Sequence, residues 1–483
     1  MASFEQIQAG QVSIGPSPLA LMHGPRPMAI LGWHIEATRW SRDQIGYMTM
    51  LYRKYGVLST WGASPPLRVF AFAPEYNQRL LSSPDLFHSQ VARATRFPDD
   101  SAVVNLRSGL LNLNGPQHKQ HRQLMSPAFH RKQVETYRDD MVALTEKALA
   151  GWSVGAVRDM EQEMRRLVHS IAMKTVLNLE NPEDVDVLTN LIARLFSAVP
   201  LAMLFPFDLP GTGYRRLLRT SEKISEFLQQ MIDEKRAHPL QHQDILAMLI
   251  AERSDDGIAM TDAELIAEGY NVLCHEGSAS ALTWTLFLLA QHPEVQADLL
   301  DELEDVLSVD PPTVEQLAQL PLLERVIKES MRLLPPVPFG RRFAVEPCQF
   351  GPYELRKGTP VFFSHYITHR MPQIYEQPQR FLPSRWEHLK PTQYEYLPFG
   401  AGTHNCVGGA FAMMEMKIVL AMTIQRFRLS VVPNTRIDRC FRFSLKPLHG
   451  LPMRILDQDR QFAWSPVGGN ISEMVELPSR ILK

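Results

Sequence analysis

The sequence has few cysteines for its length, and they lie far apart. Its 483 residues include four, at positions Cys274, Cys348, Cys406 and Cys440, with no Cys-x-x-Cys pair among them. Disulfide scaffolds and zinc ribbons both need cysteines at close, regular spacing. The spacing therefore excludes both classes, and each cysteine has to be interpreted from its own neighbours.

Long apolar runs and an excess of charge of one sign are also missing. No segment of 18 or more uninterrupted apolar residues occurs, and residues 1–24 hold neither Lys nor Arg, unlike a secretory signal. Lys and Arg number 50 against 52 Asp and Glu, so the formal charge of −2 gives no reason to expect nucleic acid as a partner. We therefore expect a cytoplasmic protein without a membrane anchor.

The sequence does contain a hydrophobic fraction of 45%, arranged mostly with helical periodicity. Two strand-like runs, residues 57–61 and 67–72, predict a small hairpin at the edge of a sheet. A capping-box pattern at residues 261–264 opens a helix predicted to continue unbroken to about residue 290, and residues 409–427 form the last predicted helix. One helix face is predicted to carry Met160, Met164, Leu167, Val168 and Ile171.

These patterns predict a mainly α fold with a small β region, in one large domain that covers residues 25–455. Beyond residue 343 the sequence pattern changes from one typical of helices to one typical of short strands and loops. Residues 1–24 are interpreted as an N-terminal extension. Residues 456–483 have weak periodicity and several turn formers, which indicates a C-terminal tail or surface extension.

Residues 399–408, Phe-Gly-Ala-Gly-Thr-His-Asn-Cys-Val-Gly, hold a single cysteine in a glycine-rich loop directly before a predicted helix. Glycines let the backbone approach a bulky flat cofactor, and amides near a helix start stabilise negative charge on sulfur. Haem iron can take such a thiolate as its ligand, and this ligation favours O–O cleavage. Cys406 is therefore the candidate metal ligand, and the alternative is a buried structural cysteine.

This loop resembles the cysteine loop of the cytochrome P450 family, Phe-x-x-Gly-x-His/Arg-x-Cys-x-Gly. The matching residues are Phe399, Gly402, His404, Cys406 and Gly408. The resemblance implies that Cys406 is the axial ligand of haem b, that His404 contacts a haem propionate and that Phe399 shields the sulfur. It also implies the cytochrome P450 fold, with a long central helix lying over the haem.

Glu329 and Arg332 lie three residues apart on a predicted helix, a spacing that on its own describes an ordinary surface pair. The P450 family has such a Glu-x-x-Arg pair joined by an arginine from a later segment. Here Phe-Leu-Pro-Ser-Arg-Trp, residues 381–386, supplies Arg385 before the cysteine. The resemblance implies a structural triad of Glu329, Arg332 and Arg385 that holds the loop beneath the haem.

Further cationic positions are candidates for binding the haem propionates. His118 and Arg122 are spaced i, i+4, and Arg342 lies ten residues beyond Arg332. Each on its own is also explained as a surface base. In the family these positions hold the propionates, because two carboxylates on a buried cofactor need charge-assisted donors to offset their desolvation. Arg341 is a weaker candidate for the same role.

The long predicted helix contains a stretch similar to the family's oxygen-binding sequence Ala-Gly-x-Asp/Glu-Thr-Thr/Ser. Glu276 matches the acid, but Gly277 stands where the threonine that helps to deliver protons is usual, and Cys274 replaces the glycine. We expect Glu276 and Ser278 to act as catalytic proton-transfer groups, because a relay needs only donors within hydrogen-bond reach. The alternative is that Gly277 makes room for substrate or haem.

The resemblance implies an oxidoreductase, a cytochrome P450 monooxygenase. It would insert one oxygen atom from O2 into a lipophilic small molecule by hydroxylation or epoxidation, with a natural product, terpenoid, steroid or fatty acid as substrate. No Gly-x-Gly-x-x-Gly fingerprint and no iron–sulfur cysteine run is present. We therefore expect electrons from NAD(P)H to arrive through a separate ferredoxin or flavodoxin-type redox partner, and we expect a monomer.

Two other functions stay open at this point. Because Gly277 replaces the threonine, the chain is also compatible with a peroxide-driven or electron-donor-independent haem-thiolate enzyme, such as a peroxygenase, isomerase or dehydratase. A haem-binding sensor or sequestering protein is disfavoured by the acid at Glu276. Residues 197–209 are apolar and are interpreted as a mobile lid or as core, and Val337 and Phe339 are candidate pocket residues.

Overall fold

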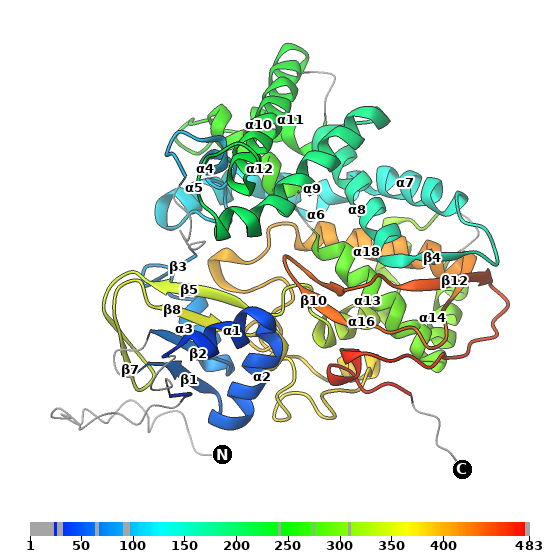
Figure 1. Cartoon of the computed structure of the whole chain (residues 1–483). Coiled ribbons are helices and arrows are strands. Elements are labelled where there is room, and N and C mark those ends of the chain that lie inside the picture. The colour runs from blue at the N-terminus through cyan, green and yellow to red at the C-terminus, as the bar shows by residue number, and fades with distance from the viewer. Residues whose placement is uncertain are drawn as a thin grey trace.

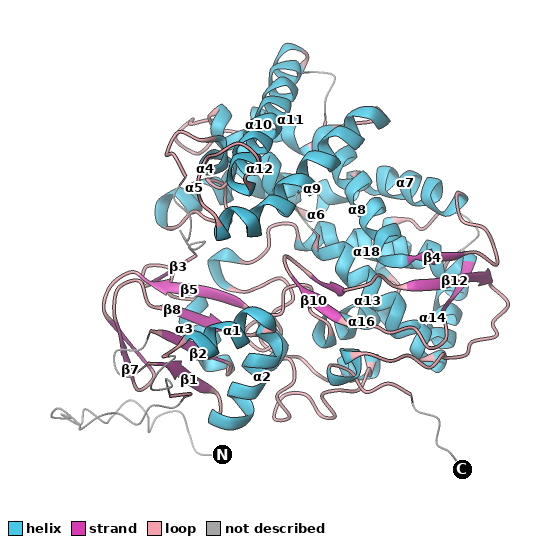
Figure 2. Ribbon diagram, in the orientation of Figure 1, coloured by secondary structure: helices cyan, strands magenta, loops and turns pink. Residues whose placement is uncertain are grey.

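The computed structural model describes residues 24–26, 32–62, 67–89, 97–239, 243–273, 276–307 and 311–478. Helices make up most of it and the strands form small sheets, as Figure 2 shows. The predicted mainly α fold with a small β region is confirmed. The predicted N-terminal extension lies almost wholly outside the described residues.

One mixed sheet forms the lower left part of the molecule in Figure 1. Its strand order is β1 (Leu58–Trp61), β2 (Arg68–Ala71), β8 (Pro360–Phe363), β5 (Gly340–Ala344) and β3 (Phe87–His88). The β1–β2 pair is the predicted hairpin, and β1 lies at the edge of the sheet as expected. Strand β2 runs parallel to β8, whereas β5 runs antiparallel to β8 with Arg341 opposite Phe362.

Aromatic side chains explain why helices cover this sheet. The ring of Trp40 lies 5.5 Å from Phe70, 4.9 Å from Phe362 and 5.4 Å from Phe339, measured between ring centroids. Edge-to-face aromatic contacts at these distances add to the free energy gained by burial. The helices next to this sheet are α1 (His34–Arg42), α2 (Gln44–Tyr55), α3 (Pro74–Leu81) and α17 (His365–Thr368).

Three smaller sheets complete the β region. They are β4 (Val157–Asp159) with β12 (Pro452–Asp457) and β9 (Phe427–Val431), β6 (Cys348–Phe350) with β7 (Tyr353–Leu355), and β10 (Arg439–Phe441) with β11 (Leu445–Pro447). The β10–β11 ladder lies against α13.

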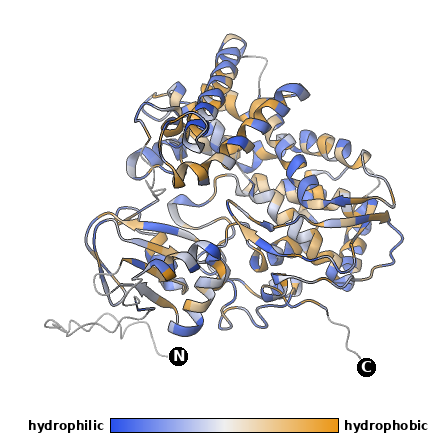
Figure 3. Cartoon of the chain, in the orientation of Figure 1, coloured by the Kyte–Doolittle hydropathy of each residue, from blue (hydrophilic) through white to orange (hydrophobic). Residues whose placement is uncertain are grey.

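The helical part fills the top and right of Figure 1. Its helices are α4 (Ala102–Leu106), α5 (Gly115–Met125), α6 (Arg131–Thr136), α7 (Arg138–Ala150), α8 (Met160–Leu177), α9 (Pro182–Leu204), α10 (Gly213–Ala237), α11 (Ile245–Ala251), α12 (Asp262–Leu273), α13 (Gly277–Gln291), α14 (Pro293–Val306), α15 (Val314–Ala318), α16 (Pro321–Leu333) and α18 (Gly409–Arg426). The outer helix α10 carries both hydrophobic and hydrophilic residues (Figure 3). In α13, by contrast, residues 278–291 are all buried.

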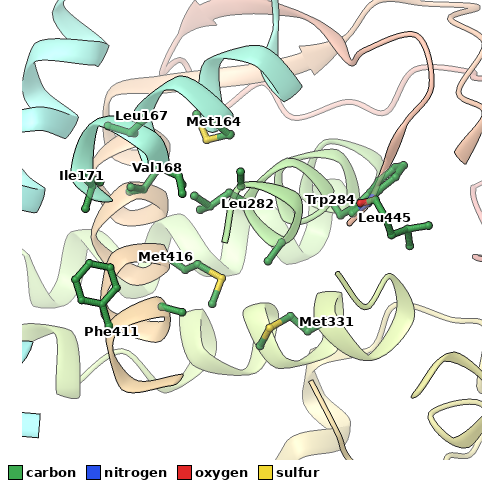
Figure 4. Packing of buried hydrophobic residues seen from close by; sticks show 14 of the residues in the cluster. Met164, Leu167, Val168, Ile171, Leu282, Trp284, Met331, Phe411, Met416 and Leu445 are labelled. Carbon is green, nitrogen blue, oxygen red and sulfur yellow. The ribbon is translucent and has the colours of Figure 1, made fainter. Parts of the chain in front are cut away.

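The core lies where α8, α13, α16 and α18 pack together. Figure 4 shows Met164, Leu167 and Val168 of α8 facing Leu282 of α13, with Met416 of α18 close by. The apolar face predicted for α8 is confirmed, because all five of its predicted residues are buried. A helix that is apolar on every side can be stable only when other helices surround it, which explains the central place of α13.

The helix predicted from residue 261 to about residue 290 is described as two helices, α12 and α13, and residues 274–275 between them lie outside the described residues. The capping box is present, since Thr261 N–H donates to Glu264 over 2.7 Å, but α12 ends at Leu273 and α13 begins at Gly277. Glycine is a poor helix former, which favours an interruption beside Gly277. Two hydrogen bonds also fix the start of α13, because Ser280 and Trp284 both donate to the carbonyl of Leu445 in β11.

The C-terminal segment differs from the predicted tail. Ile471, Met474 and Val475 are buried in the main core. Backbone hydrogen bonds also tie the segment down: Ile437 N–H donates to Gly468, and Ile471 N–H donates back to Ile437. Weak periodicity misled the sequence interpretation, because an irregular segment can bury side chains without a repeating pattern.

Helix α9 is the one helix among the described residues that is long and apolar enough to cross a membrane by length and composition alone. One third of its most apolar stretch, 33%, is buried, and it packs along α10. The predicted lid, residues 197–209, comprises its last two turns and the loop that follows. Leu204, Phe205 and Phe207 are exposed, whereas Ala198 and Ala202 are buried in the core, so the segment is core on one side and exposed at its end.

Candidate functional site

The cysteine loop is held in a tight conformation by its own backbone. The amide of Cys406 donates to the carbonyl of Phe399 over 2.7 Å, which closes the loop. Gly400 and Gly402 both have φ of +71°, a region that side chains other than glycine rarely adopt. A Cβ on Gly402 would also lie 2.1 Å from the carbonyl oxygen of Leu81. Glycine is therefore required at position 402 for two independent reasons.

The sulfur of Cys406 lies just before the first turn of α18. Burial raises the pKa of the Cys406 thiol, while the Gly408 amide and the positive charge of Arg122 act in the opposite direction. Both opposing groups stabilise negative charge on sulfur. A Cβ on Gly409 would lie 3.6 Å from the ring of Phe399, so that ring packs directly on the start of the helix.

Two of the predicted propionate-binding residues form a stacked pair. The rings of His118, on α5, and His404 lie 3.9 Å apart between centroids. His404 Nε2 donates to the carbonyl of Leu113 over 3.1 Å, and its Nδ1 accepts from the hydroxyl of Thr403. Burial, together with the charges of Arg122 and Arg342, lowers the pKa of both histidines to about 4. Both rings are therefore neutral at physiological pH.

The two predicted arginines approach the same place from opposite sides. Arg122, one turn after His118 on α5, donates to the backbone carbonyl and side-chain oxygen of Asn405, the residue before the cysteine. Arg342 projects from β5 and donates to the Arg341 carbonyl over 3.0 Å. Burial lowers the pKa of Arg342 to about 10. Within the described residues Arg342 forms no ion pair with a carboxylate, so its charge is left without an acidic partner.

The predicted triad is assembled around one fully buried carboxylate. Glu329 accepts two hydrogen bonds from Arg332, both of 2.9 Å, and one of 2.9 Å from Arg385. The amide of Leu382 and the indole N–H of Trp386 each donate to it over 3.0 Å. Burial opposes ionisation of this carboxyl, but the two guanidiniums outweigh it and hold its pKa below the ordinary value. The structure thus joins α16 to the loop that precedes the cysteine.

The two predicted proton-transfer residues lie at the interruption between α12 and α13. Glu276 is the residue before α13, and the hydroxyl of Ser444 donates to its carboxylate over 3.3 Å. Ser278 is buried in the first turn of α13. A Cβ added to Gly277 would meet no atom within 4 Å, so the space beside it is open. Cys274, at the glycine position of the expected motif, lies outside the described residues.

Comparison with known proteins identifies the arrangement. The family model named Cytochrome P450 matches residues 22–452 of the chain. The chain belongs to the cytochrome P450 family. It is therefore an oxidoreductase of the haem-thiolate monooxygenase type, with haem iron as its cofactor.

Two relatives of this P450 come from Streptomyces melanosporofaciens. Cyclooctat-9-en-7-ol 5-monooxygenase is 28% identical over 384 residues, which cover 77% of this chain and 82% of the relative. Cyclooctatin synthase is 29% identical over 373 residues, covering 73% and 80% respectively. These similarities extend over most of both chains.

Solved structures agree on the fold. A retinoic acid-bound cyanobacterial CYP120A1 superposes with a TM-score of 0.79 at 23% identity, covering 91% of this chain and all of the other. The haem domain of cytochrome P450DA gives the same TM-score at 22% identity and covers 93% of this chain. The cytochrome P450 fold predicted from the cysteine loop is confirmed.

The residues around Cys406 fit a haem. Its two propionates need hydrogen-bond donors and positive charge in a partly buried place. Arg342 and Arg122 supply charge, and the stacked rings of His118 and His404 supply neutral nitrogen atoms beside them. Positive charge without an acidic partner is expected at a site where a bound dianion, such as the two propionates of haem, balances it.

Several contributors to the site were missed from the sequence. Asn405 anchors Arg122, Trp386 completes the shell around Glu329, and Ser444 contacts Glu276. Asn405 and Trp386 adjoin predicted residues, so their positions offered a signal. Ser444 is 168 residues from Glu276 and offered none.

A second buried acid–base group was also missed. His121 of α5 donates from Nδ1 to Glu268 over 2.8 Å and from Nε2 to Glu264 over 3.1 Å. Both carboxylates lie on α12, so the group joins α12 to the helix that carries His118 and Arg122. Two of the other cysteines, Cys348 and Cys440, are half-buried free thiols.

Proposed function

We propose that this P450 inserts one oxygen atom from O2 into a lipophilic small molecule, by hydroxylation or epoxidation. The observation that carries the proposal is the position of Cys406, whose loop is closed on Phe399 and surrounded by the donors described above. The proposal assigns residues 25–455 to the haem-thiolate domain. When bound, the haem supplies the activation of O2 and the oxidising power that the protein itself lacks.

The chain's residues hold the cofactor in this proposal. The sulfur of Cys406 would hold the haem iron, and the ring of Phe399 would shield that sulfur from water. His118, Arg122, Arg342 and His404 bind the propionates. These charge-assisted hydrogen bonds offset the cost of burying the two carboxylates. Shielding of the sulfur matters because a drier setting strengthens every electrostatic interaction around it.

The triad acts on assembly and leaves the chemistry to other residues. Glu329, Arg332 and Arg385 fix the loop before the cysteine to α16, and no atom of theirs needs to touch substrate. Breaking a buried ion pair by removing one partner is strongly destabilising. The proposal therefore assigns the three residues a structural role.

Proton transfer is assigned to the interruption between α12 and α13. Glu276 holds a proton-accepting carboxylate, and Ser278 supplies a hydroxyl two residues later. Ser444 donates to Glu276 and orients its carboxylate. A proton can pass between such groups when they lie within hydrogen-bond reach, directly or through one water.

The substrate class is a proposal of its own. A natural product, terpenoid, steroid or fatty acid fits the expectation of an apolar substrate, and the exposed apolar lid at residues 197–209 supports it. The name of one relative describes oxidation of cyclooctat-9-en-7-ol, which supports a substrate of cyclic, largely hydrocarbon character. Electrons come from NAD(P)H through a ferredoxin or flavodoxin-type partner. The predictions of a cytoplasmic, monomeric protein stay predictions.

The test uses the haem-loaded protein and its Cys406→Ala variant. The dithionite-reduced wild type with carbon monoxide should show the strongly red-shifted Soret band of thiolate-ligated haem, and the variant should lose it. With a surrogate ferredoxin, its reductase and NADPH, a lipophilic panel should then yield a product one oxygen heavier. A wild-type protein without the shifted band, or NADPH consumption that yields only peroxide across the panel, would refute the proposal.

A second function is favoured by one observation, the open space beside Gly277 where no side chain supplies a hydroxyl. A peroxide-driven enzyme, or a haem-thiolate isomerase or dehydratase, needs no proton delivery to bound O2. Turnover with hydrogen peroxide, or without any electron donor, would select it. A Cβ at this position meets no atom within 4 Å, and Gly277→Thr should raise the product formed per O2 consumed if the monooxygenase proposal is correct. Gly277→Ala, which adds a methyl without a hydroxyl, is the matched control.

A further inference from the structure

The end of α9 and the loop that follows it expose apolar side chains. Although α9 is apolar by composition, only 33% of its most apolar stretch is buried. No acidic or basic residue occurs between residues 195 and 207. The exposed apolar residues here, which we call the apolar tip, are Leu201, Met203, Leu204, Phe205, Phe207 and Leu209. An exposed apolar patch of this kind marks an interaction site on a protein surface.

The loop that carries half of the apolar tip is held by its own hydrogen bonds. The hydroxyl of Thr212 donates to the carbonyls of Phe207, over 3.0 Å, and of Leu209, over 2.8 Å. The amide of Thr212 also donates to Leu209. The rings of Phe205 and Phe207 lie 4.9 Å apart between centroids. Because these side chains are already arranged, little conformational entropy is lost when they enter an apolar environment.

The leucines of the apolar tip lie on the outer side of α9. Leu201 follows Arg194 by seven residues, which places both on one side of the helix, and Arg194 lines a surface groove of about 480 Å³ between α9 and α10. Leu204, which is 81% exposed, lies one turn further on. The side chains that α9 buries form a separate stripe, namely Leu188, Ile192, Leu195, Ala198 and Ala202. The exposed leucines therefore face away from the core.

Helix α10 places positive charge beside the apolar tip. A Cβ on Gly213 would lie 2.3 Å from that of Leu201, so the start of α10 is in close contact with the end of α9. The exposed cations that follow along α10, at spacing i, i+3 and i+7, are Arg216, Arg219 and Lys223. Lys223 lines the same groove as Arg194, together with Glu226. This spacing places all three cations on the outer face of the α9–α10 pair.

The positive charge on this face is only partly balanced by acids. Between residues 208 and 223 there are four basic residues and two acidic ones, Asp208 and Glu222. Asp208, the acid of the loop, lies 3.5 Å from Arg215. Within the described ranges, none of the three exposed cations of α10 forms an ion pair with a carboxylate. The apolar tip is therefore bordered by positive charge that is free to attract an anion.

We propose that the apolar tip inserts into the surface of a membrane that contains anionic lipids, with Arg216, Arg219 and Lys223 at the level of the headgroups. A bilayer surface matches both parts of this face, because hydrocarbon lies directly beneath negatively charged headgroups. Insertion to the depth of the tip needs no spanning helix and is reversible. The inference goes beyond the proposed reaction and does not depend on it.

Vesicle sedimentation with the ferric haem-loaded protein tests the inference. The probes are vesicles of phosphatidylcholine alone and vesicles of phosphatidylcholine mixed with phosphatidylglycerol. The protein should sediment with the mixed vesicles and bind at least about tenfold more weakly to phosphatidylcholine alone, because each basic residue near an anionic surface strengthens binding. Raising the salt concentration should weaken binding to the mixed vesicles, because salt screens charge.

Two kinds of variant separate the apolar and the charged contributions. Leu204→Ser should weaken binding to the mixed vesicles by about tenfold, because the hydrocarbon of one large side chain is no longer buried. Its matched control is Leu448→Ser, which changes an exposed leucine just after β11. Arg219→Gln should weaken the same binding by about fivefold. Its control is Arg131→Gln, which changes an exposed arginine of α6. Both controls should bind like the wild type, and all four variants should keep their haem content and carbon monoxide spectrum.

Specific outcomes overturn the inference. Wild-type protein that stays in the supernatant with the mixed vesicles would refute it, as would Leu204→Ser protein that sediments as well as Leu448→Ser. Binding that neither salt nor Arg219→Gln weakens would refute the role of anionic lipid. Sedimentation velocity without vesicles tests the other occupant, a second copy of the chain. A dimer that Leu204→Ser dissociates would assign the apolar tip to self-association and refute the membrane contact.

Discussion

Two of the carboxylates that are completely buried, on α16 and on α12, are stabilised in different ways. Glu329 on α16 and Glu268 on α12 both have no exposed surface. Five hydrogen bonds reach Glu329, and both oxygens are used. Glu268 accepts through Oε1 from the amide of Leu110 and from His121, while its Oε2 has no partner among the described residues. The first site is fully satisfied and the second only partly.

The partners explain a further difference between the two sites. The arginines around Glu329 keep their charge at every physiological pH. His121 faces carboxylates with both ring nitrogens, so both must carry protons for the two hydrogen bonds to exist. Burial opposes protonation of His121, but Glu268 and Glu264 outweigh it and raise its pKa above the ordinary value. One buried acid is therefore permanently paired, and the other is paired through a group that titrates.

The largest effect is expected from Glu329→Gln. This change leaves Arg332 and Arg385 buried without an anion, which should cost about 3–5 kcal/mol of the free energy of unfolding. Urea unfolding of the holoprotein measures it, and the yield of haem-loaded protein should fall as well. The control is Glu135→Gln, which breaks an exposed pair with Arg131 and should cost less than about 0.5 kcal/mol. Equal losses in the two variants would contradict the assigned structural role.

Glu268→Gln should destabilise the protein less, by about 2 kcal/mol. The amide oxygen of glutamine can still accept from Leu110, and Oε2 has no hydrogen bond to lose. The charge-assisted contact with His121 is weakened. Unlike Glu329→Gln, however, the change leaves no buried arginine without an anion. The same urea experiment decides the order of the two effects. If Glu268→Gln cost as much free energy of unfolding as Glu329→Gln, the number of hydrogen bonds to each carboxylate would not explain the difference between the sites.

The pH dependence should separate the two sites next. Because the pKa of His121 is raised on folding, its contribution is fully present below about pH 6.5 and is lost as the pH rises through the folded pKa. The destabilisation caused by His121→Gln should therefore shrink by on the order of 1 kcal/mol between acidic and alkaline buffers. The pKa of Glu329 is lowered, so its contribution is present above about pH 4.5 and is lost only as the pH falls through the folded value. The Glu329→Gln penalty should stay constant over the range where that of His121→Gln changes.

The smallest effect is expected from Trp386→Phe. It removes one of the two donors to Oε2 of Glu329 and keeps the ring, so the cost should be about 0.5–1 kcal/mol. A double-mutant cycle with Glu329→Gln should show that most of this loss disappears when the carboxylate is absent. Additive losses would mean that Trp386 acts by packing alone.

The same contrast explains what the sequence could predict. Glu329 has its partners three residues away and in a recognisable segment before the cysteine, so its role could be anticipated. Glu268 and His121 are 147 residues apart in the sequence. No local sequence pattern predicts that either residue takes part in a buried pair. Local spacing reveals contacts within one helix, whereas long-range pairs depend on how the helices pack.

The fold shows a similar division. Periodicity predicted the apolar face of α8, the β1–β2 hairpin and the helix that follows the cysteine. It did not predict the interruption between α12 and α13, since the contacts that fix the start of α13 come from Leu445 in a distant strand. The buried C-terminal segment was missed for the same reason, because its position depends on hydrogen bonds to residues such as Ile437.

The C-terminal segment also sets the order of events during synthesis. Arg370 donates to the carbonyl of Met474, a residue made more than one hundred positions later. Buried side chains at Ile471 and Val475 likewise wait for the last part of the chain to emerge. Chains elongate at about 5–20 residues per second. The earlier segments therefore wait several seconds on the ribosome before the C-terminal segment has been synthesised. The newborn protein can complete this part of its core only after residue 475 has been synthesised.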